Sequence, residues 1–232
     1  MIPVSPAPEP ADFDSTVRQP GLRLIAEKIG EKPIRSRKKG KPFKKLAGVD
    51  ARDKIPADEF KDYWREAIDD MLIAYNRICA YSCFRIHRVT GAASVDHMAP
   101  KSRRWDQVYE WSNYRLASSR MNARKNNFED ILDPFEIENG WFQLADFGFA
   151  VCANPELNQD MTKRVKATIL RLNLNDEHHL TQREDDIDSY VSGDWSWQEL
   201  VKQSPFVARE LLRQGRLRPE DSTVASAMFP CV

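Results

Sequence analysis

The feature that most constrains this chain is one segment, residues 94–127, that places a carboxylate, an imidazole and side-chain amides in a fixed order. An Asp-His pair, Asp96 and His97, is followed by Asn113 and then by Asn122, with basic residues around them. An imidazole takes a proton from water near neutral pH, and hard oxygen ligands select small divalent cations. The segment therefore predicts a site that holds one divalent cation and deprotonates a water beside a phosphate.

The side-chain types indicate how the chemistry is divided within this site. Asp96 offers a carboxylate oxygen and Asn122 an amide oxygen to the metal, and His97 is suited to act as the general base. Successive side chains of a strand point to opposite faces, so Asp96 and His97 cannot both face one cation from an undistorted strand. We therefore expect the strand to end or to bulge at this pair.

The ordered pattern Asp-His-x-x-Pro-Lys-Ser, Trp-x-Asn-x-x-Leu and Asn-x-x-Lys resembles the HNH nucleases over about residues 79–133. The resemblance implies a ββα-metal core that binds Mg²⁺, Mn²⁺ or another divalent cation through Asp96 and Asn122, with His97 as the general base. It places Asn113 in the catalytic motif as the residue that ties down the loop between hairpin and helix. It also implies that Lys125 contacts phosphate.

Further basic residues of the segment are candidates for positioning the nucleic-acid backbone rather than for reading bases. They are Lys101, Arg103, Arg104, Arg120 and Arg124. Outside the segment, residues 35–45 carry seven basic residues and no acid in a chain whose formal net charge is zero. Such a run is compatible with nucleic-acid contact and equally with a solvated linker.

The cysteines match only part of the structural zinc site that many HNH nucleases carry. Cys79 and Cys83 stand where the first cysteine pair belongs. Ser118 and Met121 stand near the second pair, and neither holds zinc well. We therefore expect no structural zinc, with Cys79 and Cys83 as small buried hydrophobic residues.

The predicted fold class is α+β, with a ββα-metal core, flanking helices and a C-terminal region built from a hairpin and helices. Residues 1–54 are expected to form an extended, basic arm with a short helix at 22–29. Residues 55–135 should form the nuclease core with a preceding helix, and residues 136–232 should pack on that core.

Local patterns predict the elements of these regions. For the core they predict a helix over 59–79, strands at 84–90 and 92–98 joined at Gly91, and a helix from about 115 to 125. For the C-terminal region they predict a hairpin across 141–152 and helices over 157–172, 177–191 and 194–214, the last broken at Pro205.

Composition narrows the class of protein. Hydrophobic residues make up 41% of the chain, enough for an ordered core. Four cysteines are too few for a disulfide scaffold, and no stretch of apolar residues is long enough to span a membrane. We therefore expect a cytoplasmic protein with reduced thiols and no membrane partner.

These observations lead to one hypothesis with two alternatives. The hypothesis is a metal-dependent endonuclease that hydrolyses phosphodiester bonds in DNA in preference to RNA. The resemblance places such nucleases in bacterial defence or restriction systems, sometimes beside a partner ATPase, and a homodimer is compatible with it. One alternative is a nucleic-acid-binding module with little turnover. The other is a ribonuclease, or a nuclease subunit that is active only within a larger assembly.

Overall fold

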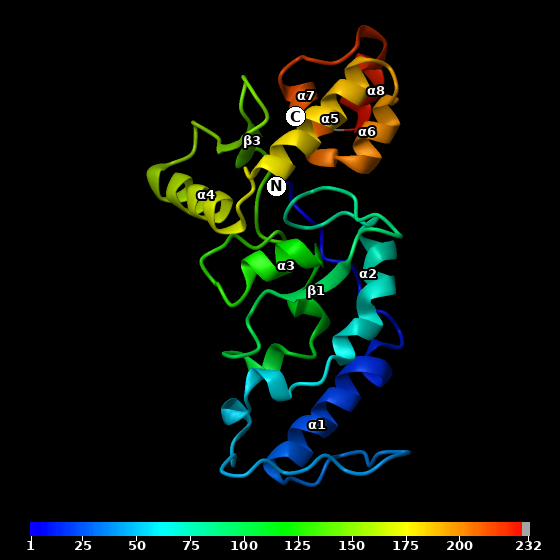
Figure 1. Ribbon diagram of the computed structural model, residues 1–232, viewed down its shortest axis with the longest axis vertical. Helices are drawn as coiled ribbons and strands as arrows, with labels where there is room; N and C mark the ends of the chain where they lie inside the picture. The colour runs from blue at the N-terminus through cyan, green and yellow to red at the C-terminus, as the bar shows by residue number, and fades with distance from the viewer. Residues whose placement is uncertain (229–232) are drawn as a thin grey trace.

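The chain folds into helices around two small antiparallel sheets in the computed structural model, which describes residues 1–228. The pair β1–β2 lies near the middle of the molecule, with α1 and α2 along one side and α5 to α8 gathered at the far end (Figure 1). This arrangement confirms the α+β class. The bounds are α1 Gln19–Ile29, α2 Ile68–Ala74, β1 Ala93–His97, β2 Tyr114–Ser118, α3 Ser119–Lys125, β3 Phe142–Leu144, β4 Val151–Ala153, α4 Gln159–Leu172, α5 Glu177–Val191, α6 Trp197–Gln203, α7 Pro205–Arg213 and α8 Ser222–Met228.

The central sheet differs from the predicted hairpin in the choice of the second strand. β1 pairs with β2, with Asp96 opposite Arg115 and His97 opposite Tyr114. The predicted strand at 84–90 is wrong, because residues 87–90 are all exposed and have no face to bury. The His87 ring accepts hydrogen bonds from the amides of residues 89 and 90, which closes a turn there instead.

The helix predicted for residues 59–79 is also shorter than expected. A 3₁₀ turn at Tyr63–Ala67 leads directly into α2, which ends at Ala74. Asn76 and Arg77 then adopt positive φ angles of 50° and 63°. This left-handed turn reverses the chain, and the Arg77 guanidinium donates to the carbonyl of Ile86. The helix predicted from about residue 115 likewise begins later, at Ser119, because β2 occupies residues 114–118.

The N-terminal arm is packed against the central sheet rather than free. Residues 1–10 form no regular secondary structure, and the buried Phe13 immediately precedes a π-helical segment, Asp14–Arg18, that leads into α1. The Phe13 ring meets the rings of Trp111 and Tyr114 edge-on, at centroid distances of 5.6 and 5.7 Å. The Trp111 indole donates to the carbonyl of Ala7 at 2.8 Å. The arm thereby supports the strand that lies opposite His97.

The basic run forms a surface loop anchored on α1. The amide of Phe43 donates to the Glu27 carboxylate, and the amide of Leu46 donates to the carbonyl of Lys28 at 2.9 Å. The Arg37 guanidinium lies 3.4 Å from the centre of the Phe43 ring. The lysines of this run are exposed. Nucleic-acid contact by this loop stays a prediction.

The C-terminal region follows the predicted pattern closely. β3 pairs with β4 as a hairpin, α4 and α5 lie where helices were predicted, and Pro205 separates α6 from α7. Among residues 1–228, no helix is both long and apolar enough to cross a membrane. Cys231, one of the four cysteines expected to be reduced, lies outside the described residues.

Candidate active site

A cleft of about 700 Å³ runs along the free edge of β1. All five residues of β1 line it, together with Asn122 from α3 and Lys101 from the loop that follows β1. Because β1 has a partner on one side only, side chains from both of its faces can reach this edge. This explains how Asp96 and His97 share one cleft. The strand ends at His97 with regular pairing, so the predicted strand end is confirmed and no bulge is needed.

The Asp96 carboxylate is held on one side and open on the other. Its side chain is almost fully buried, and Oδ2 accepts a hydrogen bond from the Tyr81 hydroxyl at 2.5 Å. The Lys125 ammonium lies 3.4 Å from the same oxygen. Burial raises the pKa of Asp96 to about 6, against the opposing effects of Lys125 and Tyr81. No described residue donates to Oδ1, so that oxygen is the one available to a ligand in the cleft.

Lys125 occupies a different place from the predicted one. Its side chain is completely buried, and its ammonium donates to the main-chain carbonyls of His97 at 2.5 Å and Met98 at 3.0 Å. Burial lowers the pKa of Lys125, while the Asp96 charge opposes that shift. The predicted phosphate contact is therefore wrong in this structure. Lys125 is instead the buried partner of Asp96 and a support for the end of β1.

The His97 ring is oriented and kept neutral by its surroundings. Nε2 lies 2.9 Å from the carbonyl oxygen of Val108, which can only accept, so Nε2 carries the proton. Nδ1 has no partner among the described residues and keeps its lone pair. The Trp64 and Tyr114 rings enclose the imidazole edge-on, at centroid distances of 4.8 and 5.2 Å. Burial lowers the pKa of His97 to about 3, so the ring is in its basic form at neutral pH.

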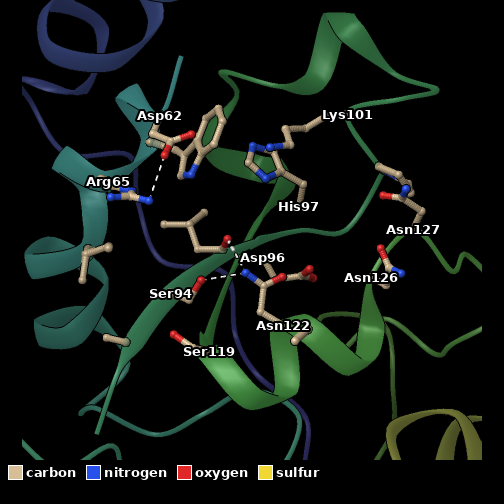
Figure 2. A pocket seen from close by; sticks show the side chains of 16 residues that line it. Asp62, Arg65, Ser94, Asp96, His97, Lys101, Ser119, Asn122, Asn126 and Asn127 are labelled. Atoms are coloured by element: carbon tan, nitrogen blue, oxygen red, sulfur yellow. Dashed lines mark hydrogen bonds and ion pairs between the residues drawn. The ribbon is translucent and has the colours of Figure 1, made fainter. Parts of the chain in front are cut away.

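The Asn122 side chain connects α3 to the free edge of β1. Its Nδ2 lies 2.6 Å from the Ser94 hydroxyl and 3.1 Å from the carbonyl of Val95. Because that carbonyl only accepts, the amide nitrogen must face it, which leaves Oδ1 of Asn122 without a donor among residues 1–228. Figure 2 shows Asn122 reaching from the helix to the strand beside Asp96.

The two open oxygens fit a small, hard cation. Asp96 Oδ1 and Asn122 Oδ1 are the ligand types that Mg²⁺ accepts, and Mg²⁺ keeps several waters besides its protein ligands. Within the described part of the chain, no group of three or more His, Cys, Asp or Glu residues could hold a metal. A cation at this cleft would therefore depend on one carboxylate, one amide, water and the substrate.

Asn113 lies outside the cleft lining and uses its amide to close the adjoining loop. Its Oδ1 accepts from the amide of Ala99 at 2.7 Å, and its Nδ2 donates to the carbonyls of Ala99 and Gln107 at 3.1 and 3.0 Å. Asn113 therefore ties down a loop, but this loop joins β1 to β2 within the hairpin and not, as was predicted, the hairpin to the helix. Asn113 is accordingly a positioning residue for the loop that carries Lys101, not a group in contact with the reacting atoms.

Of the five further basic candidates, Lys101 alone lines the cleft. Its ammonium lies 4.2 Å from the centre of the Trp64 ring, beside His97. Burial lowers the pKa of Lys101. Arg103 and Arg104 are exposed on the same loop and pair with Glu129 and Asp106.

The two arginines of α3 face away from this cleft, toward the C-terminal region. Arg120 and Arg124 both pair with Asp176, the residue that caps α5. Arg124 also donates to the main-chain carbonyls of residues 172 and 173. The predicted phosphate contact is therefore replaced by a structural role for Arg124, whereas Arg120 stays half exposed.

The structure adds residues to the site that the sequence pattern did not indicate. Asp62 and Arg65 line the cleft opposite β1 and form an ion pair at 2.9 Å. Asn126 and Asn127 line its end beyond α3. Asp62 immediately precedes the 3₁₀ turn before α2 and Arg65 lies within it, and no spacing in the sequence connects that turn to the Asp-His motif. Tyr81, which orients Asp96, was missed for the same reason.

The two cysteines are buried, as predicted. Cys79 and Cys83 are each 1% exposed, and the Cys79 sulfur accepts a hydrogen bond from the amide of Ser118 at 3.4 Å. The Met121 side chain, on α3, is also buried. The absence of a structural zinc stays a prediction.

Comparison with known proteins does not assign the chain to a family. No protein-family model matches the sequence, and no curated protein matches it significantly. The motif and the geometry of the cleft are therefore the grounds on which a function can be proposed.

The Tyr81 hydroxyl provides a direct test of how Asp96 is oriented. Tyr81→Phe keeps the buried ring and removes the donor to Asp96 Oδ2. We expect the affinity for Mg²⁺, measured by titration calorimetry, to fall about ten- to a hundredfold, since the ligand oxygen is no longer oriented. Tyr75→Phe is the matched control, because that hydroxyl binds the amide of Ala7 away from the cleft. Equal Mg²⁺ affinity in both variants would contradict the role of Tyr81.

Proposed function

We propose that this protein is a metal-dependent endonuclease of the HNH type that hydrolyses phosphodiester bonds in DNA. The observation that supports this most is the content of the cleft along β1. A neutral imidazole with a free Nδ1, from His97, lines the same cleft as the unpaired oxygens of Asp96 and Asn122. The order of β1, β2 and α3 in the chain agrees with a ββα-metal core.

The geometry suggests how the residues divide the work. His97 Nδ1 accepts a proton from the attacking water, while the Val108 carbonyl holds the ring in the required tautomer. Tyr81 and Lys125 hold Asp96, so that its other oxygen faces the cleft. A divalent cation bound by Asp96 and Asn122 would stabilise negative charge on the phosphate and the leaving oxygen.

The positively charged side chains of the cleft are suited to bind the substrate and not to activate the attacking water. Lys101 lies beside His97 at the mouth of the cleft, and Arg65 lies on the opposite wall. Arg65 is paired with Asp62, so the ammonium of Lys101 is the group that attracts and orients a phosphodiester, without reading its sequence. DNA is the proposed substrate class, on the strength of the HNH resemblance, with RNA as the comparison to be made.

The first experiment is a cleavage assay on supercoiled plasmid DNA. We expect nicked or linear product with Mg²⁺ or Mn²⁺, no product with EDTA, and recovery when Mg²⁺ is added back in excess. The same reactions on single-stranded RNA measure the preference between substrates. A His97→Gln protein purified in parallel controls for contaminating nucleases. Cleavage that persists in EDTA, or that is equal in the variant, would refute the proposal, and binding without cleavage would favour the binding-module alternative.

A further inference from the structure

A second groove, of about 540 Å³, lies between the central sheet and the C-terminal helices. Ser118 lines the groove, whereas the next residue, Ser119, lines the catalytic cleft. Gly91 and Ala93, two positions apart, are divided between the two hollows in the same way. The same two stretches of chain, at the start of α3 and just before β1, therefore contribute to both hollows.

Two arginines line this groove, Arg120, which pairs with Asp176, and Arg85. Arg77 and Arg88 do not line the groove but lie close to Arg85, since the charges of Arg88 and Arg85 act on Arg77. Arg77 donates to the carbonyl of Ile86, and Arg85 donates to the carbonyl of Asn76 at 3.2 Å. Among residues 1–228, the guanidinium groups of Arg77, Arg85 and Arg88 form no ion pair with a carboxylate. Burial and the charges of Arg88 and Arg85 lower the pKa of Arg77.

The acidic residues around the groove are already engaged. The Asp186 carboxylate accepts from Gln182 at 2.8 Å and from the Ser204 hydroxyl. Lys202 and Gln203 donate to the Glu199 carboxylate, and the Arg85 charge adds to the lowering of the Glu199 pKa. Arg77, Arg85 and Arg88 together outweigh the remaining charge of Asp186, so positive charge is in excess on this side of the groove.

The chemistry of these groups favours phosphate. A guanidinium donates several planar N–H groups, which match the oxygens of a phosphodiester better than a single ammonium does. Trp195 and Phe84 line the groove and are partly exposed, so apolar surface lies beside the arginines. Arginines next to aromatic rings are typical of surfaces that follow a nucleic-acid strand.

We propose that this groove, through Arg85 in its lining and Arg88 and Arg77 beside it, binds the phosphodiester backbone of the nucleic acid on one side of the scissile bond. The inference depends on the proposed nuclease function, because it takes the catalytic cleft as the place where the scissile phosphate lies. Each strand of a duplex carries a phosphate about every 3.4 Å along its axis, so a backbone leaving the cleft brings further phosphates past the start of α3. The contact is independent of base sequence.

The test measures the salt dependence of binding in a protein that does not cut. In a His97→Gln background, we compare Arg85→Gln/Arg88→Gln with the parent, using a short fluorescent duplex over a series of KCl concentrations. Two lost phosphate contacts should reduce the slope of log Kd against log salt by about 2. Arg164→Gln/Lys166→Gln is the matched control, because it removes the same charge from an exposed face of α4. Its slope should equal that of the parent.

The possible results distinguish a failure of the groove proposal from a failure of the proposed nuclease function. With His97 present, Arg85→Gln/Arg88→Gln should raise KM and leave kcat close to that of the wild type, with an unchanged circular dichroism spectrum. In one result, the wild type cuts DNA while Arg85→Gln/Arg88→Gln keeps the salt slope and the KM of its parent. That result would refute phosphate binding by the groove and leave the proposed nuclease activity intact. If the wild type neither cuts nor binds DNA, both are overturned.

Discussion

Replacing His97 by glutamine should slow DNA cleavage at saturating Mg²⁺ by about 10²- to 10⁴-fold, with DNA binding retained. The glutamine amide can still donate to the Val108 carbonyl, as Nε2 of the imidazole does. It offers no nitrogen that takes a proton from water. The measurement is single-turnover cleavage of a labelled duplex, with binding followed by anisotropy. A variant that cuts at the wild-type rate would remove His97 as the general base.

Two further readouts distinguish a missing base from a disturbed fold. In His97→Ala, added imidazole should restore part of the activity, whereas it should do nothing for the wild type or for His97→Gln. The pH profile provides the second readout. Because burial lowers the pKa of His97 to about 3, its basic form persists at any pH above that value. The cleavage rate of the wild type should therefore not fall with an apparent pKa of about 6.5 as the pH is lowered. Such a fall in the wild type, absent in His97→Gln, would contradict the lowered pKa of His97.

Replacing Lys125 by methionine should lower the free energy of unfolding by about 3–5 kcal/mol at neutral pH, because Asp96 would be left buried without its cation. The measurement is urea unfolding at equilibrium. The pKa of Asp96 is already raised to about 6, so Asp96 is mostly ionised at neutral pH. Removing Lys125 raises that pKa further. The loss should therefore be largest well above pH 6 and should shrink as the pH falls, because protonation removes the unpaired charge.

Two controls decide between a buried ion pair and a phosphate contact for Lys125. Lys166→Met, on an exposed face of α4, should change stability by less than about 0.5 kcal/mol. The double variant Asp96→Asn/Lys125→Met should recover much of the loss, which gives a coupling energy for the pair. If Lys125→Met is as stable as Lys166→Met but binds DNA more weakly, the phosphate contact implied by the HNH resemblance would be right after all.

Local signals in the sequence predicted several parts of the structure correctly. The end of β1 at His97 follows from the alternation of side chains along a strand. The helices α4 and α5 follow from apolar residues at helical spacing, and the break between α6 and α7 follows from Pro205. Each of these signals acts within a few residues, so it can be read without knowing what lies opposite in the fold.

Tertiary contacts decided the rest. The sequence could not indicate that β1 pairs with residues 114–118 rather than with 84–90, because pairing depends on which faces become buried. It could not indicate that Lys125 is turned inward to Asp96, since a lysine after a helical asparagine is as readily exposed.

The sequence by itself determined the order of chemical groups in the site: carboxylate, imidazole and amide. Only the tertiary structure decided which residues contact each of these three groups. Tyr81 reaches Asp96 across 15 positions of chain, and Asn122 reaches the free edge of β1 across 27. Such contacts depend on burial and on the closing of loops between distant residues, and no local pattern records them.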